Sequence, residues 1–315
     1  MIAYAITTAI LVLIAILLGF ALNLQWGTAG LVNFGIAGFF ALGAYTTGLT
    51  ALAGAGTVLS IFAAVIVCAI SCGAMAAISA RLSDEYLAIL TLGFSEIVGL
   101  VALSEDELTG GSLGLAGIPR PLDGVLMPEY YESAFLCLLL AVVIGVYLAL
   151  NRILRSPFGR ALRTVREDEV VAETLGKNVL SLRIRAFALG GAIIGVAGAF
   201  HAFYLTYIDP TQFAATITGY TFMAVIFGGR GSNRGLIVGA ALIMTMLEST
   251  RFLKDAIGFL NATQLASLRL ILVGLGLVLL LIYRPQGFFR EYRLKGSAFF
   301  TPQSSPQEPS RKEPQ

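Results

Sequence analysis

The sequence has few of the side chains that carry out chemistry in enzymes. It contains one histidine, His201, and three cysteines, Cys68, Cys72 and Cys137. His201 lies within a long apolar run, where a packed and hydrogen-bonded role is commoner than metal ligation, and the motifs HExxH and GxxxxGK(S/T) are absent. An odd number of cysteines within apolar runs indicates buried thiols rather than disulfides or a metal site. We therefore expect a protein that is not an enzyme, with no catalytic, cofactor-binding or metal-binding residues.

Charged residues are also scarce: they make up 13% of the 315 residues, compared with about 25% in an average soluble domain. The net charge of +2 is too small to indicate a nucleic-acid partner. Hydrophobic residues account for 57% of the chain, and several apolar runs approach the roughly 20 residues that a helix needs to cross a bilayer. The composition therefore predicts an all-α fold, a polytopic transmembrane helical bundle in a lipid bilayer.

The apolar runs predict about 8–9 membrane segments. The run at 216–228 is short and ends at Gly228 and Gly229, so it either spans the membrane or forms a re-entrant half-helix. The first run follows no basic region and is too long for the apolar part of a signal peptide, so we expect a span of the mature protein. The runs lie at about 3–23, 29–50, 57–80, 86–103, 134–151, 184–207, 216–228, 235–250 and 266–283.

Lysine and arginine in the short loops indicate which side of the membrane each loop occupies. Eight basic residues between 152 and 185 predict that this segment is cytoplasmic, and four more between 284 and 295 predict a cytoplasmic C-terminus. The loop at 104–133 has one basic residue, Arg120, and is expected outside. If the run at 216–228 spans the membrane, the assigned loops alternate between the two sides and the N-terminus lies outside. If that run is re-entrant, the predicted side of the N-terminus changes.

Glycines recur within the apolar runs at spacings that let helices pack closely. Gly191 and Gly195, and again Gly235 and Gly239, are four residues apart, and Gly198 follows the first pair. Small residues at this spacing allow helix backbones to approach one another in lipid. We therefore expect these glycines to serve helix packing in preference to direct contact with a transported molecule.

Four polar residues within or between the runs are candidates for lining a translocation pathway. Glu96 lies inside a run, where an acid is unfavourable in lipid, so it could face a polar pathway or accept hydrogen bonds from a neighbouring helix. Asn23, Gln25 and Asn33 surround a break in the stretch ALNLQWGTAG. Amides at such a break could line a polar cavity or satisfy the backbone groups that the break leaves free.

The small number of intramembrane charges bears on how the protein is driven. A proton- or sodium-coupled transporter usually needs intramembrane Asp, Glu or His, and an ion channel usually shows a filter motif or a ring of charge. Neither pattern is clear. Because of Glu96, an ion-coupled transporter remains an alternative, and because of the glycine-rich runs, a passive channel remains another. A pore without its own ion site indicates that energy enters from outside the membrane, through a partner protein.

The segment SPFGRALRTVREDEVVAETLGKN at 156–178 concentrates charge between two apolar runs. Ser156 and Pro157 are typical of a helix start. The acids Glu167–Glu169 favour the start of a second short helix, and Gly176 favours its end. The sequence therefore predicts two short amphipathic helices at the cytoplasmic face.

One side of the first short helix is apolar. Ala161, Leu162 and Val165 fall at helical spacing, with arginines around the rest. A loop that only sets the orientation of the chain needs lysine and arginine but no apolar stripe, whereas a helix that docks into a groove of another protein needs the stripe as well. We therefore expect this stripe, and the second helix ending at Gly176, to face a partner.

Several stretches resemble the branched-chain amino acid ABC transporter permeases of the LivM type. The segment at 156–178 is similar to the cytoplasmic coupling segment of that family, and WGTAGLVNFGIAGFFALGAY at 26–45 to its glycine-rich second span. LTGGSLGLAGIP at 108–119 is similar to its TGGxxGLxGI loop, GGRGSNRGLIVGA at 228–240 to its GGxGSxxGPxxGA motif, and RPQGFF at 284–289 to its RPxGL ending. The resemblance covers about residues 23–289.

The resemblance implies a bacterial inner-membrane permease subunit that binds no nucleotide itself. A second homologous permease would complete the pore, two cytoplasmic ATPase subunits would drive it, and a periplasmic substrate-binding protein would deliver branched-chain or related amino acids. Permeases for urea or short-chain amides share much of this pattern and remain an alternative. Residues 1–289 would form the transmembrane permease domain, and 290–315 a cytoplasmic tail that is disordered from about 301 because of its polar, proline-rich composition.

The resemblance and the helix pattern together assign the residues that couple the pore to the ATPases, within a coupling segment at 153–182. They are Pro157, Gly159, Arg160, Ala161, Leu162, Val165, Arg166, Glu167, Asp168, Glu169, Ala172, Leu175 and Gly176.

Overall fold

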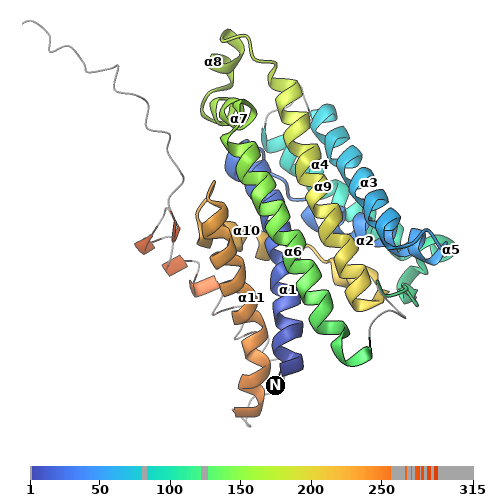
Figure 1. Cartoon of the computed structure of the whole chain (residues 1–315). Coiled ribbons are helices and arrows are strands. Elements are labelled where there is room, and N and C mark those ends of the chain that lie inside the picture. The colour runs from blue at the N-terminus through green and yellow to red at the C-terminus, as the bar shows by residue number, and fades with distance from the viewer. Residues whose placement is uncertain are drawn as a thin grey trace, which may run out of the picture.

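The computed structural model describes residues 2–79, 84–121 and 127–256, and in addition 267, 271, 274–276, 278–279, 282–284 and 287–289. The described part is a bundle of long helices (Figure 1). Within the described residues, five helical stretches are long and apolar enough to cross a membrane. They are α1 (Ile2–Leu22) with its π-helical continuation η1 (Asn23–Thr28), α3 (Thr57–Ile78), α4 (Asp84–Ser104), α6 (Pro128–Arg155) and α9 (Val179–Leu205).

The remaining elements are shorter or less apolar. Helix α2 (Ile36–Leu52) is apolar and has 17 residues, and α10 (Thr216–Gly228) has 13. Helix α11 (Asn233–Ala256) has 24 residues. The short elements are α5 (Asp106–Thr109), η3 (Gly111–Leu113), β1 (Leu115–Ala116), α7 (Pro157–Glu167), α8 (Glu169–Thr174), β2 (Tyr207–Ile208) and η4 (Pro210–Phe213).

The predicted helical membrane bundle is confirmed, but the number of 8–9 segments is not established by the described residues. The run at 29–50 becomes a helix only from Ile36, because the preceding residues form the break. Helix α10, at about 20 Å by the rise of an α-helix, is shorter than the roughly 30 Å hydrocarbon core, so its crossing stays a prediction. Most of the run at 266–283 and the predicted tail at 290–315 lie outside the described residues.

Helix α9 lies at the centre of the bundle and packs directly against the backbones of α2 and α3 (Figure 1). A Cβ atom added to Gly195 would lie 2.6 Å from the carbonyl oxygen of Ala64 on α3. A Cβ atom added to Gly198 would lie 2.8 Å from the carbonyl oxygen of Phe40 on α2. Real Cβ atoms do not approach so closely, so only glycine fits, and the predicted packing role is confirmed for this helix.

Helices α10 and α11 form a hairpin whose backbones also touch through glycine. A Cβ atom on Gly235 would lie 1.9 Å from the carbonyl oxygen of Gly228, and one on Gly239 would lie 2.3 Å from that of Ala224. The chain returns to this hairpin near its end, because the Phe288 amide donates to the Phe227 carbonyl at 2.9 Å. The motif that begins at Gly228 and the described end of the RPQGFF motif therefore meet at one end of α10.

The glycine-rich loop at 108–119 folds tightly onto the end of α9. Strand β1 pairs antiparallel with β2, with Leu115 opposite Ile208. Gly114 has a φ of +70°, and a Cβ atom there would lie 2.1 Å from the Ile208 carbonyl oxygen. The glycine permits both the left-handed conformation and the close approach.

His201 is a packed residue, as predicted, and Gln212 connects it to an acid outside the spans. The His201 Nε2 atom lies 3.3 Å from Gln212 Oε1, and its ring contacts the rings of Phe40 and Phe213. The Gln212 amide donates to Asp209 at 2.9 Å. Partial burial raises the pKa of Asp209, but hydrogen bonds from Thr211 and Gln212 outweigh it and lower that pKa below its ordinary value.

Candidate functional site

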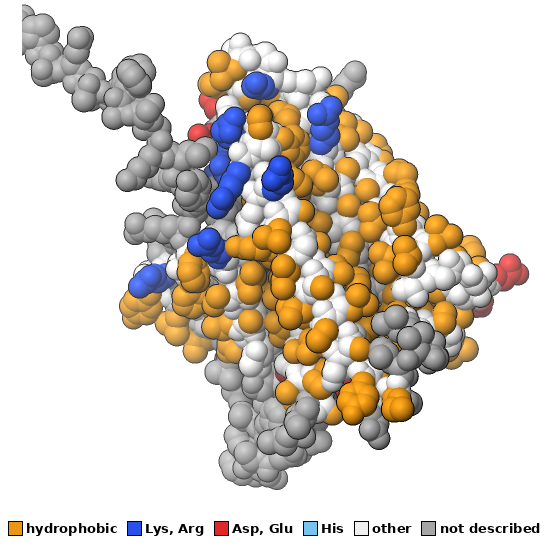
Figure 2. Space-filling model, viewed as in Figure 1, with side chains coloured by type: hydrophobic (Ala, Val, Ile, Leu, Met, Phe, Trp, Pro, Cys, Tyr) orange, Lys and Arg blue, Asp and Glu red, His pale blue; other side chains and the backbone are white. Residues whose placement is uncertain are grey.

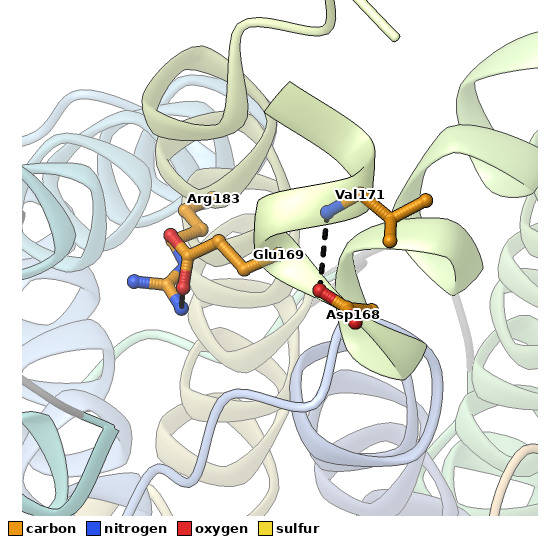
Figure 3. A network of polar contacts seen from close by, with 4 residues as sticks. All are labelled: Asp168, Glu169, Val171 and Arg183. Carbon is orange, nitrogen blue, oxygen red and sulfur yellow. Dashed lines mark hydrogen bonds and ion pairs between the residues drawn. The ribbon is translucent and has the colours of Figure 1, made fainter. Parts of the chain in front are cut away.

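The two short helices of the coupling segment form where the sequence predicts them. Helix α7 has Pro157 in its first turn. Helix α8 is capped by Asp168, whose side chain accepts a hydrogen bond from the Val171 amide at 3.1 Å (Figure 3). Gly176 follows α8 with a φ of +74°, and the Lys177 amide returns to the Ala172 carbonyl at 3.1 Å. The start, the cap and the end are therefore set by local residues.

The apolar stripe of α7 packs inside this chain. Leu162 is fully buried in the main core, and Val165 is 6% exposed in a small cluster with Ala172 and Val179. Gly159 lies against α6, since a Cβ atom there would be 2.4 Å from the Leu154 carbonyl oxygen. The prediction that Leu162 and Val165 face a partner is wrong, because α7 folds back onto the end of the bundle and buries its own stripe.

The exposed apolar surface of the segment lies on and after α8. Val170 is 69% exposed, Leu175 is 65% exposed, and Val171 is also exposed. We call Val170, Val171 and Leu175 the α8 face. Leu175 was among the predicted residues, whereas Val170 and Val171 were missed. The sequence did contain a signal for these two valines. In a helix as short as α8, one residue, Ala172, faces the bundle, so helical spacing directs the neighbouring valines outward.

The other predicted coupling residues divide by exposure. Ala161, Arg166 and Glu169 are half-buried. The residues on the surface are Pro157, Arg160, Glu167, Asp168 and Gly176. Figure 2 shows that basic side chains gather at the end of the bundle that carries α7 and α8, above a broad apolar surface.

An ion pair ties α8 to α9. The Arg183 guanidinium on α9 lies 2.8 Å from the Glu169 carboxylate at the start of α8 (Figure 3). The arginine side chain is 13% exposed and the glutamate 42%, so solvent screens the pair in part. A pair of this kind contributes up to about 1 kcal/mol and fixes the position of α8 more than it stabilises the fold.

Arg166 connects α7 to the break between α1 and α2. Its Nη1 atom donates to the carbonyl oxygen of Gly27 in η1. Its aliphatic stem lies over Gly30, where an added Cβ atom would be 2.9 Å from the Arg166 Cγ atom and where φ is +82°. The coupling segment is therefore joined both to the central helix α9 and to the break.

Asn23 joins the break to the turn between α10 and α11. It is fully buried, and its Nδ2 atom donates to Asn233 Oδ1 at 2.8 Å. Its Oδ1 atom accepts from the Gly231 amide at 2.8 Å. Asn233 in turn donates to Asn151 Oδ1 on α6 at 3.2 Å, so one chain of amides connects three parts of the bundle.

Gln25 and Asn33 join the break to α9 in the same way. Both are fully buried. The Gln25 amide donates to the Phe187 carbonyl at 3.1 Å, and Asn33 donates to Gln25 Oε1 at 2.9 Å. Asn33 Oδ1 accepts from the Gly35 amide at 2.8 Å. In this conformation the amides satisfy backbone groups, which was one of the two alternatives, and a role in lining the pathway stays a prediction.

Glu96 lies apart from the buried amides. It is exposed on α4, on the side opposite the residues that pack against α2. Its neighbour Ser95 faces α2 instead, since a Cβ atom added to Gly38 would lie 2.5 Å from the Ser95 Cα atom. The structure therefore places Glu96 on the outer surface of this chain.

The cysteines do not form a metal or disulfide site in the described part of the chain. Cys68 and Cys72 are free and buried, whereas Cys137 is free and exposed on α6. The prediction of a buried thiol is therefore wrong for Cys137. No group of three His, Cys, Asp or Glu side chains that could hold a metal ion occurs among the residues described.

Known proteins resemble this chain over most of its length. Residues 4–282 match the family described as branched-chain amino acid transport system / permease component. The LivM permease protein of the high-affinity branched-chain amino acid transport system of Salmonella typhimurium is 31% identical over 90% of this chain and 69% of that protein. The corresponding LivM protein of Escherichia coli is 31% identical over 89% of this chain and 68% of that protein.

A second type of permease matches a smaller part. The probable LivH branched-chain amino acid transport permease of Methanocaldococcus jannaschii is 34% identical over 36% of this chain and 34% of that protein. No solved structure matches the chain. The family match spans the break, the coupling segment and the α10–α11 hairpin together, so the chain belongs to the permease components of branched-chain amino acid transport systems.

Proposed function

We propose that this chain is a permease subunit of an ATP-driven ABC importer for branched-chain or related amino acids. A second, homologous permease completes the translocation pathway, and a periplasmic binding protein delivers the amino acid. The observation that carries the proposal is the exposed α8 face on a segment fixed to the bundle, in a chain of this family. Such a surface fits a groove on a soluble partner, the pair of cytoplasmic ATPase subunits.

The coupling segment transmits movement of the ATPases to the membrane helices by two routes. One runs from α8 through the cluster of Val165, Ala172 and Val179 and the Glu169–Arg183 pair into α9. The other runs from α7 through Arg166 into η1. Both routes end on elements that carry the buried amide network, so displacement of the segment biases the bundle between inward-open and outward-open states.

The orientation follows from the distribution of basic residues. The end of the bundle with α7 and α8 carries the basic cluster, which supports a cytoplasmic position for the coupling segment and for the C-terminus. The glycine-rich loop around β1 then faces the periplasm, where the binding protein docks. The chain is a multi-pass protein of the inner membrane.

The substrate class follows from the relatives. The LivM relatives, whose names specify branched-chain amino acids, match about nine-tenths of this chain at 31% identity. A guanosine ABC transporter permease of Bacillus subtilis matches less of it, at 27% identity over 70%. Reconstitution with the ATPases and the binding protein tests the assignment: leucine uptake that requires ATP supports it, and uptake driven by a proton or sodium gradient alone overturns it.

The variant Leu175→Asp tests the α8 face. A carboxylate in the centre of an apolar contact is left desolvated and unpaired, so we expect the ATPase subunits to dissociate and ATP-dependent uptake to be lost. Co-purification of the ATPases with the tagged permease measures the effect. Leu113→Asp makes the same change on an exposed residue of the loop near β1 and should leave co-purification intact. Retention of the ATPases by Leu175→Asp at the wild-type level contradicts the proposal.

A further inference from the structure

Helix α4 has an inner face that packs against α2 and an outer face that nothing in the described chain covers. On the inner face, Phe94 stacks on Phe39 at 4.5 Å between ring centroids, and Thr91 Oγ1 accepts from the Phe34 amide at 3.0 Å. The opposite side is exposed along the length of the helix. We define the α4 outer face by its residues at helical spacing: Tyr86, Ile89, Gly93, Glu96, Ile97 and Leu100.

A carboxylate on this face argues against lipid as its neighbour. Glu96 is twelve residues from Asp84 and eight from Ser104, about 18 Å and about 12 Å along the axis. The short glutamate side chain cannot reach the membrane surface from that depth. Acids inside membrane helices face protein or a water-filled cavity, because a charge in hydrocarbon is strongly unfavourable.

Gly93, one turn before Glu96, supports a protein neighbour. Beyond its own helix turn, no described residue lies within 4 Å of a Cβ atom added there, whereas Gly195 and Gly38 are glycines because another backbone touches them. A glycine inside a helix lowers helix stability, so its presence at an open position favours close approach by a helix of another chain. The acid and the glycine are independent observations on the same face.

Helix α3 has an exposed side whose composition suits contact with lipid. Its exposed residues include Val58, Phe62, Ile66 and Ile70, and its exposed apolar side carries no charged side chain. The α4 outer face differs from it in the acid and in the open glycine, while the surrounding exposed residues are equally apolar. The difference between the two faces therefore lies in features suited to a protein contact.

We propose that the α4 outer face is the surface on which the second permease chain packs, with Gly93 at the closest approach and Glu96 at the edge of the aqueous pathway enclosed between the two chains. A soluble partner is excluded by the depth of Glu96, and lipid is excluded by its charge. This proposal rests on the proposed function, which supplies the second permease.

Site-specific photo-crosslinking in the assembled importer tests the contact. A photoreactive amino acid replaces Ile89 or Leu100, which flank Gly93 and Glu96, or Ile70 on α3 as the control with matching exposure (65% for Ile89 and 66% for Ile70). We expect adducts with the second permease from Ile89 and Leu100, severalfold above those from Ile70. Adducts with a second copy of this chain, with lipid alone, or equally from all three positions overturn the proposal.

A pair of leucine variants gives a second readout. Gly93→Leu should reduce the amount of second permease that co-purifies severalfold. It should not lower the thermal stability of this chain alone, because no described residue beyond its own helix turn occupies that space. Ala74→Leu changes an exposed small residue on the same side of α3 as Ile70, and should retain the second permease. Undiminished co-purification with Gly93→Leu overturns the α4 contact alone. If the wild-type chain retains no second permease, the proposed function itself fails.

Discussion

Arg166→Ala is expected to lower ATP-dependent amino acid uptake by more than about tenfold while the assembled complex continues to hydrolyse ATP. Arg166 is the side chain that joins α7 to the break, through its hydrogen bond to the Gly27 carbonyl and its contact with Gly30. A hydrogen bond from a charged donor contributes about 1.5–3 kcal/mol. Its loss leaves the α8 face and its ion pair in place, so the ATPases still dock, but their movement no longer reaches η1.

The measurement compares uptake and ATP hydrolysis in the same proteoliposomes, and we expect uptake to fall by more than about tenfold, since 1.4 kcal/mol corresponds to a factor of ten. Arg152→Ala is the matched control, because it removes the same charge from an exposed position at the same end of the bundle. It should behave as the wild type. If Arg166→Ala lowers hydrolysis and uptake in parallel, the arginine serves docking, and the transmission role is wrong.

The coupling segment shows what local sequence can predict and what it cannot. Pro157, Asp168 and Gly176 act within one or two turns of the backbone, so the two helices could be placed from the sequence alone. The direction in which the stripe faces depends on what α7 folds against. Leu162 looked like a docking residue because an amphipathic helix has the same pattern whether its partner is another protein or its own chain.

The break between α1 and α2 shows the same limit over longer distances. Its amides could be found from the sequence, but the partners of Asn23 and Gln25 could not. Asn23 binds a residue 210 positions away, and Gln25 binds a carbonyl 162 positions away. The π-helical turn η1 follows from these tertiary hydrogen bonds, which no local periodicity reports, and it delays the start of α2 to Ile36.

For Glu96, the sequence showed that the residue lies within an apolar run, but it did not show which side of the helix the residue occupies. Helical spacing shows which residues share a side of α4, and only the packing of α2 shows which side is inward. The structure leaves Glu96 outward, where the proposed contact with a second permease would give it a role. Residues that act between subunits are therefore the ones that a single sequence identifies least well.

Gly195→Ala and Gly145→Ala are expected to change stability in opposite directions, although each adds the same methyl group to a glycine of a membrane helix. The Cβ atom at Gly195 would lie 2.6 Å from the Ala64 carbonyl oxygen and 3.0 Å from the Val65 Cα atom. Both are backbone atoms, so α9 and α3 must move apart, and overpacking of this kind costs about 1–3 kcal/mol. Because Gly195 also contacts Gly43 of α2, the displacement disturbs both neighbours of the central helix.

At Gly145 the added methyl group meets no described residue beyond its own helix turn within 4 Å, and alanine favours the helix by up to about 1 kcal/mol over glycine. Thermal unfolding of the purified protein in detergent should therefore show a lower Tm for Gly195→Ala and a higher Tm for Gly145→Ala. Equal shifts for the two variants would contradict the close contact of α9 with α3. In the proposed mechanism α9 receives the movement of the coupling segment, and this contact holds α9 in place. Gly195→Ala should therefore also reduce uptake per folded molecule, which Gly145→Ala should not.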